Sequence, residues 1–77
     1  MSSFTLRVHS WKDFDTAFTK LRFVQLRETN EAIYYQNPDG AIEIIQKSEH
    51  LDQPYIEEKL KEIGMSYRVF VWLSTKT

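Results

Sequence analysis

The chain has 77 residues, no cysteine, 42% hydrophobic and 27% charged side chains, and a formal net charge of −1. This length predicts one domain, residues 1–77, and the composition excludes a disordered chain, disulfides and cysteine-ligated zinc. No apolar stretch approaches the roughly 20 residues that cross a bilayer, and the N-terminus lacks the pattern of a secretory signal, so we expect a cytoplasmic protein.

The charge is distributed unevenly along the chain. Residues 1–27 carry a net charge of +3, residues 28–62 carry −6, and residues 63–77 carry +2. Domains that bind nucleic acid through the phosphate backbone are usually basic as a whole, and this one is not. The balance therefore favours a protein partner or self-association, and a local basic patch that binds RNA is the alternative.

The first predicted elements are a strand and a helix. Apolar and polar residues alternate over residues 4–8, which predicts a strand. The next apolar residues are spaced by three, four and three positions: Trp11, Phe14, Phe18 and Leu21. This spacing predicts an amphipathic helix with an aromatic stripe facing the core, and Ser10 is suited to cap its start.

Three strands are predicted next, over residues 23–29, 32–36 and 41–47. The clearest turn signal in the chain, Asn37-Pro38-Asp39-Gly40, separates the second from the third. Proline presets its own φ angle and glycine tolerates a positive one, so this segment is suited to a tight turn. The two strands that it joins are therefore predicted to form an antiparallel hairpin.

A second helix and a last strand complete the predicted order. Asp52 and Pro54 are suited to the start of a helix, and Gly64 is suited to end it after Ile63. Residues 67–73 alternate in the manner of a strand. The predicted fold class is therefore α+β, with the order β-α-β-β-β-α-β and two helices packed on one face of an antiparallel sheet.

The middle of the chain carries a longer motif. The stretch RFVQLRETNEAIYYQNPDG follows the first predicted helix, and a polar loop and the second helix come after it. Over residues 11–66 the chain resembles HicA toxins, small ribonucleases of bacterial toxin–antitoxin pairs with a double-stranded-RNA-binding-domain-like α-β-β-β-α fold. Residues of the same type as in that family stand at six positions: Phe23, Arg27, Tyr35, Pro38, Asp39 and Gly40.

One departure from this family decides what the resemblance implies. Where HicA toxins have Gly-Ser-His, this chain has Asn30-Glu31-Ala32, so that alanine replaces the catalytic histidine. RNA cleavage needs a side chain that takes up or delivers protons near neutral pH, and alanine does neither. The resemblance thus implies the scaffold without the activity, and an active ribonuclease would need a relocated base, for which His50 is the candidate.

The last predicted strand carries the most informative side chains. On a strand, Arg68, Phe70 and Trp72 share one face, with Val69 and Val71 on the other. Three interpretations are open: both faces of the sheet are covered and the rings belong to the core, the group contacts a protein, or it stacks on unpaired bases of RNA. A protein interface on this face or on an exposed edge strand is the preferred functional hypothesis.

The remaining candidates are isolated residues. Arg27, Lys47 and His50 join Arg68, Phe70 and Trp72 as candidate binding residues, with RNA as the alternative ligand. His9 and His50 are the only histidines, and both are predicted to be solvated surface residues. The sequence contains no recognisable catalytic constellation, metal site or cofactor motif, so the predicted function is a noncatalytic interaction module.

Overall fold

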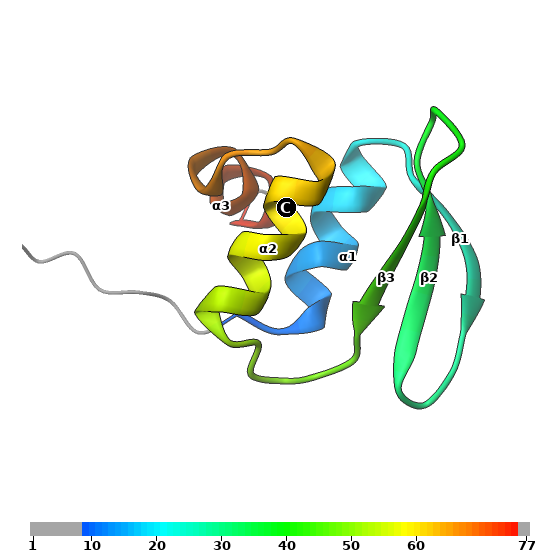
Figure 1. The fold of residues 1–77 in the computed structure, drawn as a ribbon, viewed down its shortest axis with the longest axis horizontal. Coiled ribbons are helices and arrows are strands. Elements are labelled where there is room, and N and C mark those ends of the chain that lie inside the picture. Colours follow the sequence, from blue (N-terminus) through cyan, green and yellow to red (C-terminus); the bar gives the residue numbers. More distant parts are fainter. Residues whose placement is uncertain (1–8, 76–77) are drawn as a thin grey trace, which may run out of the picture.

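A computed structural model of the protein describes residues 9–75 (Figure 1). Three helices and three strands follow one another in the order α1 (Trp11–Lys20), β1 (Val24–Glu28), β2 (Ala32–Gln36), β3 (Ile42–Gln46), α2 (Gln53–Ile63) and α3 (Tyr67–Thr75). The α+β class, the first helix, the three central strands and the second helix are confirmed. The strand predicted over residues 4–8 lies outside the described residues.

Helix α1 begins as its sequence predicts. Ser10 is the N-cap, and its side chain accepts a hydrogen bond from the backbone N–H of Lys12. The spacing of the apolar residues places Phe14, Ala17 and Phe18 on one side, where all three are buried. The helix therefore contributes an aromatic stripe to the core.

The three strands form one antiparallel sheet in the order β1-β2-β3. The hairpin between β2 and β3 pairs Gln36 with Ile42, and its turn closes through hydrogen bonds between Asn37 and Ala41. Gly40 has a φ angle of 98°, a conformation that residues with a Cβ rarely adopt. The predicted hairpin and the role of its glycine are both confirmed.

Helix α2 also has the predicted ends. Asp52 is its N-cap residue, although its side chain makes no capping hydrogen bond, and a proline occupies the first turn. Gly64 ends the helix with a φ angle of 73°, in the left-handed conformation typical of this position. Ile56 and Leu60 form the buried side of the helix.

The last element corrects a prediction, because residues 67–73 lie in helix α3 and not in a strand. Ser66 caps this helix: its side chain accepts a hydrogen bond from the N–H of Val69, and its carbonyl accepts one from the N–H of Phe70. Phe70 and Leu73, three positions apart, are buried. The β-branched and aromatic residues of this segment have a high strand propensity, but the helix lets Phe70 pack against Phe14 of α1, and this packing outweighs the propensity.

The core lies between the helices and one face of the sheet. Figure 1 shows α1 as the helix nearest the sheet and β1 as the strand farthest from the helices. Phe14 of α1 lies against Phe70 of α3, with ring centroids 4.6 Å apart, and Phe18 packs edge-to-face on Tyr35 of β2. Aromatic pairs of this kind stabilise the core beyond the area that they bury.

Candidate interaction surfaces

The sheet has an outer face that no described helix covers. The strand register places two rows of side chains across this face: Val24, Gln36 and Ile42 in one row, and Arg27, Tyr34 and Ile44 in the other. Val24 is 58% exposed, Ile42 49% and Ile44 42%. Three large aliphatic side chains are thus exposed together on one small face, and this grouping makes the face a candidate binding surface.

Arg27 supplies the charge of the outer face. Its guanidinium lies 5.7 Å from the centre of the Tyr34 ring, within the range of a cation–π contact. The carboxylates of the strands belong to the opposite side, because Glu28 pairs with Ile33 and Glu43 with Tyr35 in the register. The strand residues of the outer face therefore carry one positive charge and no negative one.

Strand β1 is the least protected part of the sheet. All five of its residues are exposed, including those that point toward the helix side. The strand is at the edge of the sheet, and a bulge between Gln25 and Arg27 interrupts its pairing with β2. Bulges and charged residues on an edge strand oppose indiscriminate pairing with other chains, so the open edge is partly blocked.

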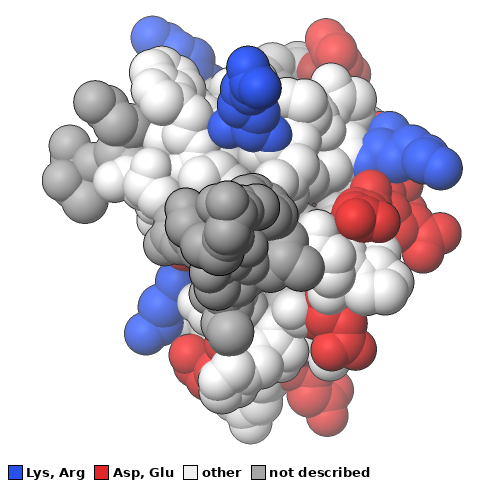
Figure 2. Space-filling view, turned by 90° about the vertical axis from the view of Figure 1, so that its left-hand side faces the viewer, with Lys and Arg blue, Asp and Glu red and all other residues white. Residues whose placement is uncertain are grey.

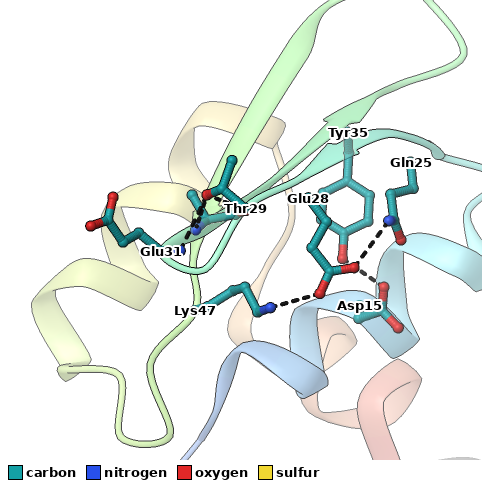
Figure 3. Close-up of polar contacts among 8 residues, drawn as sticks. Asp15, Gln25, Glu28, Thr29, Glu31, Tyr35 and Lys47 are labelled. Carbon is teal, nitrogen blue, oxygen red and sulfur yellow. Dashed lines mark hydrogen bonds and ion pairs between the residues drawn. The ribbon is translucent and has the colours of Figure 1, made fainter.

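A polar cluster lies on the helix side of β1, as Figure 3 shows. Lys47 donates a hydrogen bond of 2.6 Å to Glu28, and its ammonium lies 5.3 Å from the centre of the Trp11 ring. Hydrogen bonding and the charge of Lys47 lower the pKa of the Glu28 carboxyl. Because each group has a partner, this cluster fixes the end of β3 against β1.

A short turn joins β1 to β2 and leads into Ala32. The Thr29 hydroxyl accepts hydrogen bonds from the backbone N–H groups of Glu31 and Ala32, which closes the turn (Figure 3). Ala32 is the first residue of β2 and is half-buried. The backbone of the turn is thus fixed by threonine, and its side chains provide no imidazole.

A second polar contact joins the sheet to α1. The Tyr35 hydroxyl donates a hydrogen bond of 2.6 Å to the Asp15 carboxylate (Figure 3). Burial raises the pKa of the Tyr35 phenol far above its usual range, and the hydrogen bond to Asp15 acts in the same direction. The phenol therefore stays neutral and holds β2 to the helix layer.

His9 is the main correction among the polar residues, because it is completely buried and not a solvated surface residue. Its Nδ1 lies 2.6 Å from an Asp13 carboxylate oxygen, and its Nε2 lies 2.8 Å from the Tyr67 hydroxyl. The ring also packs edge-on against Phe70. An imidazole with no exposed surface is inaccessible to a substrate, so this chain of hydrogen bonds connects the start of α1 to α3.

Helix α3 carries a second candidate surface. Trp72 is 59% exposed, and Arg68 and Val69, one turn before it, are exposed as well. Beside them are two adjoining hollows of about 510 and 240 Å³ that share Leu21, Ile63 and Met65. Together they are bounded by the residues that follow: Leu21, Phe23, Asn37, Pro38, Asp39, Ile63, Gly64, Met65, Ser66 and Val69. We call this combined depression the end hollow, because it lies where α1 and α2 end.

The structure separates the six residues that the sequence put forward as a binding set. Phe70 belongs to the core, so the predicted shared face of Arg68, Phe70 and Trp72 is wrong. Arg68 and Trp72 do share the exposed side of α3, because four residues correspond to about one helical turn. Arg27 lies on the outer face, Lys47 lies on the helix side of the sheet, and His50 is exposed in the loop before α2.

The outer face itself was missed by the sequence analysis. Its signal was present in β3, where Ile44 and Ile45 are adjacent in a strand. Neighbouring residues of a strand point to opposite faces, so apolar residues at both positions indicate that both faces contact something. Ile45 contacts the core, whereas Ile44 is exposed to solvent.

Comparison with known proteins gives no relative. No protein-family model, no curated protein and no solved structure matches the chain. Within residues 9–75, no group of three or more potential metal ligands is present, and every buried side-chain nitrogen or oxygen has a hydrogen-bond partner. None of the helices in the same range has the length and hydropathy to cross a membrane. The interpretation of the chain therefore depends on its own surfaces.

Proposed function

We propose that this domain is a noncatalytic interaction module that binds another protein through the outer face of its sheet. The observation that carries the proposal is the exposure of Val24, Ile42 and Ile44 on a face that the described helices leave open. Burying such side chains stabilises a complex by roughly 25 cal/mol for each Å² of apolar surface removed from water. Interfaces obtain most of their affinity from a few residues near the centre of the contact, and tyrosine and arginine, which this face also carries as Tyr34 and Arg27, are prominent among them.

The chemistry of the face defines the kind of partner. Its only charged strand residue is Arg27, which is held over Tyr34. A matching partner presents aliphatic side chains to Ile42 and Ile44 and a carboxylate to the guanidinium. Three strands of five residues cover roughly 14 by 17 Å, since strands are about 4.8 Å apart and rise about 3.3 Å per residue.

That estimate favours a partner that extends beyond the sheet. Stable complexes bury about 800 Å² on each partner, which is several times the flat area of the three strands. A second copy placed face to face would cover only this small area. A different protein that also contacts the neighbouring loops is therefore the occupant that we propose, and self-association through the sheet is an outcome of the test.

The proposal retains the scaffold implied by the resemblance to HicA toxins but not their activity. The segment from α1 to α2 has the order α-β-β-β-α. Ala32 stands at the position of the family's catalytic histidine, and His9 is enclosed by Asp13 and Tyr67. These residues support a binding role for the scaffold, and descent from HicA toxins stays a prediction.

RNA is the second candidate ligand, and one contact favours it. A partly exposed tyrosine beside an arginine on an open sheet is suited to stack on unpaired bases, and Tyr34 with Arg27 is such a pair. The remaining proposed RNA contacts are dispersed: Lys47 is paired with Glu28, and Arg68 and Trp72 lie on α3. A protein partner is therefore the better match.

Site-specific photo-cross-linking in cells that express the chain tests the proposal. A photoreactive phenylalanine analogue replaces Tyr34 on the outer face, and the same analogue at Glu58, exposed on α2, is the matched control. We expect a protein adduct from position 34 and none from position 58. RNA adducts from position 34 would support the alternative instead, and adducts to a second copy of the chain would indicate self-association.

The cross-linked protein is then purified and its affinity for the domain is measured. We expect Ile44→Thr to weaken binding about tenfold or more, because one buried aliphatic side chain contributes more than 1.4 kcal/mol at the centre of an interface. Glu58→Gln is the control and leaves the affinity unchanged. Equal affinity of wild type and Ile44→Thr would contradict the proposed surface.

A further inference from the structure

The end hollow and helix α3 form a surface that the proposed function does not use. Three partly buried apolar residues at the ends of α1 and α2 line both parts of the hollow: Leu21, Ile63 and Met65. Phe23 and Val69 line its two ends. Figure 1 places α3 on one side of the molecule and β1 on the opposite side.

Trp72 projects beside this hollow. It is the most exposed of the large hydrophobic side chains of residues 9–75. Val69, three positions before it on α3, lines the hollow, so the indole and the hollow are neighbours on one surface. The opposite side of the helix is fixed in the core by Phe70 and Leu73, and Lys20 donates a hydrogen bond of 2.7 Å to the Leu73 carbonyl.

The charges beside the two features are opposite in sign. Arg68 is exposed one turn before Trp72, and Asp39 lines the end hollow. Arg22, which is exposed in the chain between the lining residues Leu21 and Phe23, adds a positive charge nearby. A basic side chain that approaches the hollow would therefore be attracted to the carboxylate of Asp39. Figure 2 views the side that carries α3 and shows basic side chains standing on the uncharged surface of its upper part, with acidic side chains gathered toward its right and lower edges.

From these observations we infer that the chain forms a two-fold symmetric dimer in which Trp72 of each copy occupies the end hollow of the other. A two-fold contact requires a self-complementary surface, and a surface that carries a projection beside an apolar depression is one way to meet that requirement. The same operation brings Arg68 of each copy toward Asp39 of the other. Both contacts therefore occur twice, and each copy contributes the same residues.

This dimer is expected to be weak. Helix α3 has nine residues and is about 14 Å long, so the shared surface is smaller than the roughly 800 Å² per partner of a stable complex. An indole nonetheless buries about 150–250 Å², and tryptophan and arginine are the residue types that dominate interface energetics. We expect a dissociation constant on the order of 100 μM.

Sedimentation equilibrium over a range from micromolar to millimolar chain concentration tests the dimer. The wild type is expected to pass from monomer to dimer, and Trp72→Ser is expected to remain monomeric. Ile44→Thr, which changes the outer face instead, should dimerise like the wild type. A wild type that stays monomeric at millimolar concentration, or a Trp72→Ser variant that still dimerises, would overturn the inference.

Tryptophan fluorescence gives an independent measurement. The chain has two tryptophans, so Trp11→Phe leaves Trp72 as the sole emitter. Transfer of its exposed indole into an apolar hollow predicts an emission maximum that moves to shorter wavelength as the concentration of chain rises. An emission maximum that is unchanged while the protein dimerises would place Trp72 outside the interface and contradict the inference.

A charge exchange tests the symmetry of the contact. Arg68→Glu and Asp39→Lys should each raise the dissociation constant by about tenfold, because each places like charges together twice in the dimer. The double variant restores opposite charges in both contacts and should recover most of the affinity. A double variant that is at least as weak as the single ones would exclude the pairing of Arg68 with Asp39, and circular dichroism confirms that each variant is folded.

Discussion

The two faces of the sheet are built from the same kinds of residues and have different surroundings. Ile33 and Ile45 on the helix side are each 1% exposed, whereas Ile42 and Ile44 on the outer face are each more than 40% exposed. All four are β-branched residues in adjacent antiparallel strands. Strand formation therefore depends on local propensity, whereas burial depends on which side of the sheet the helices occupy.

This difference separates residues that stabilise the domain from residues that are available for binding. Side chains of the inner face contribute to the free energy of folding because they leave water when the chain folds. Side chains of the outer face are only about half covered in the folded chain, so they contribute less to folding and lose the rest of their exposed surface only when another molecule covers them. Substitutions on the two faces should consequently have separable effects on stability and on binding.

The buried and exposed sides of α3 differ in the same way, and we expect the largest effect on stability from a substitution on the buried side. Phe70→Ala is expected to destabilise the domain by about 3–5 kcal/mol, because it removes a fully buried ring that contacts Phe14 and His9. Trp72→Ala, on the exposed side of the same helix, should change the free energy of unfolding by less than about 1 kcal/mol. Urea unfolding followed by circular dichroism measures both. Similar losses for the two variants would contradict the assignment of the two sides.

The next effect compares adjacent residues of β3. Ile45→Ala is expected to cost about 2–5 kcal/mol, since it leaves a cavity in the core. Ile44→Ala is its matched control and should cost less than about 1 kcal/mol when measured at low protein concentration, where the monomer predominates. Thermal unfolding of both variants provides the measurement. An equal loss for Ile44→Ala would mean that the outer face is covered within the monomer.

Helix α3 shows what the sequence could not decide. Tyr67 to Leu73 alternates as a strand does, yet Phe70 and Leu73 are also spaced as one side of a helix. Both patterns bury apolar residues, and the position of α1 selects the helix by offering Phe14 as a packing partner. Ser66 was the local sign of a helix start, since serine at this position caps the first turn.

Elsewhere in the chain, short sequence signals were sufficient to predict the turns and the helix ends. Gly40 and Gly64 have the positive φ angles that their neighbours in sequence predict, and Ser10 caps α1. These features depend on a few consecutive residues. The burial of His9 depends instead on Tyr67, which is 58 positions away in the chain. A contact of that range leaves no local pattern, so the histidine was assigned to the surface.

The smallest effect concerns Glu43, the buried carboxylate on the inner face of the sheet. The residue is 8% exposed, and its carboxyl interacts with Glu62 and Lys59 of α2. Burial raises its pKa, Glu62 raises it further, and Lys59 lowers it in part. Because the pKa in the folded state is higher than in the unfolded state, the group stabilises the fold at low pH, and this contribution is lost as the pH rises through the raised pKa.

Glu43→Gln should therefore stabilise the domain at pH 7 by up to about 1 kcal/mol, because it removes the cost of burying a carboxylate beside Glu62. Below the pKa of an unfolded glutamate, wild-type Glu43 is protonated in both states, so the difference between variant and wild type should disappear. Measuring the free energy of unfolding of both proteins at pH values between about 3.5 and 7 tests whether the two become equally stable at low pH. The range extends below the ordinary glutamate pKa of about 4.3. Glu58→Gln, an exposed change of the same kind on α2, is the control and should leave the free energy of unfolding at pH 7 within about 0.5 kcal/mol of the wild type. If Glu43→Gln destabilises the domain at pH 7, the attraction between Glu43 and Lys59 outweighs the cost of burying the carboxylate. In that case a charged group would stabilise the inner face of the sheet, contrary to the expectation that burial there favours uncharged side chains.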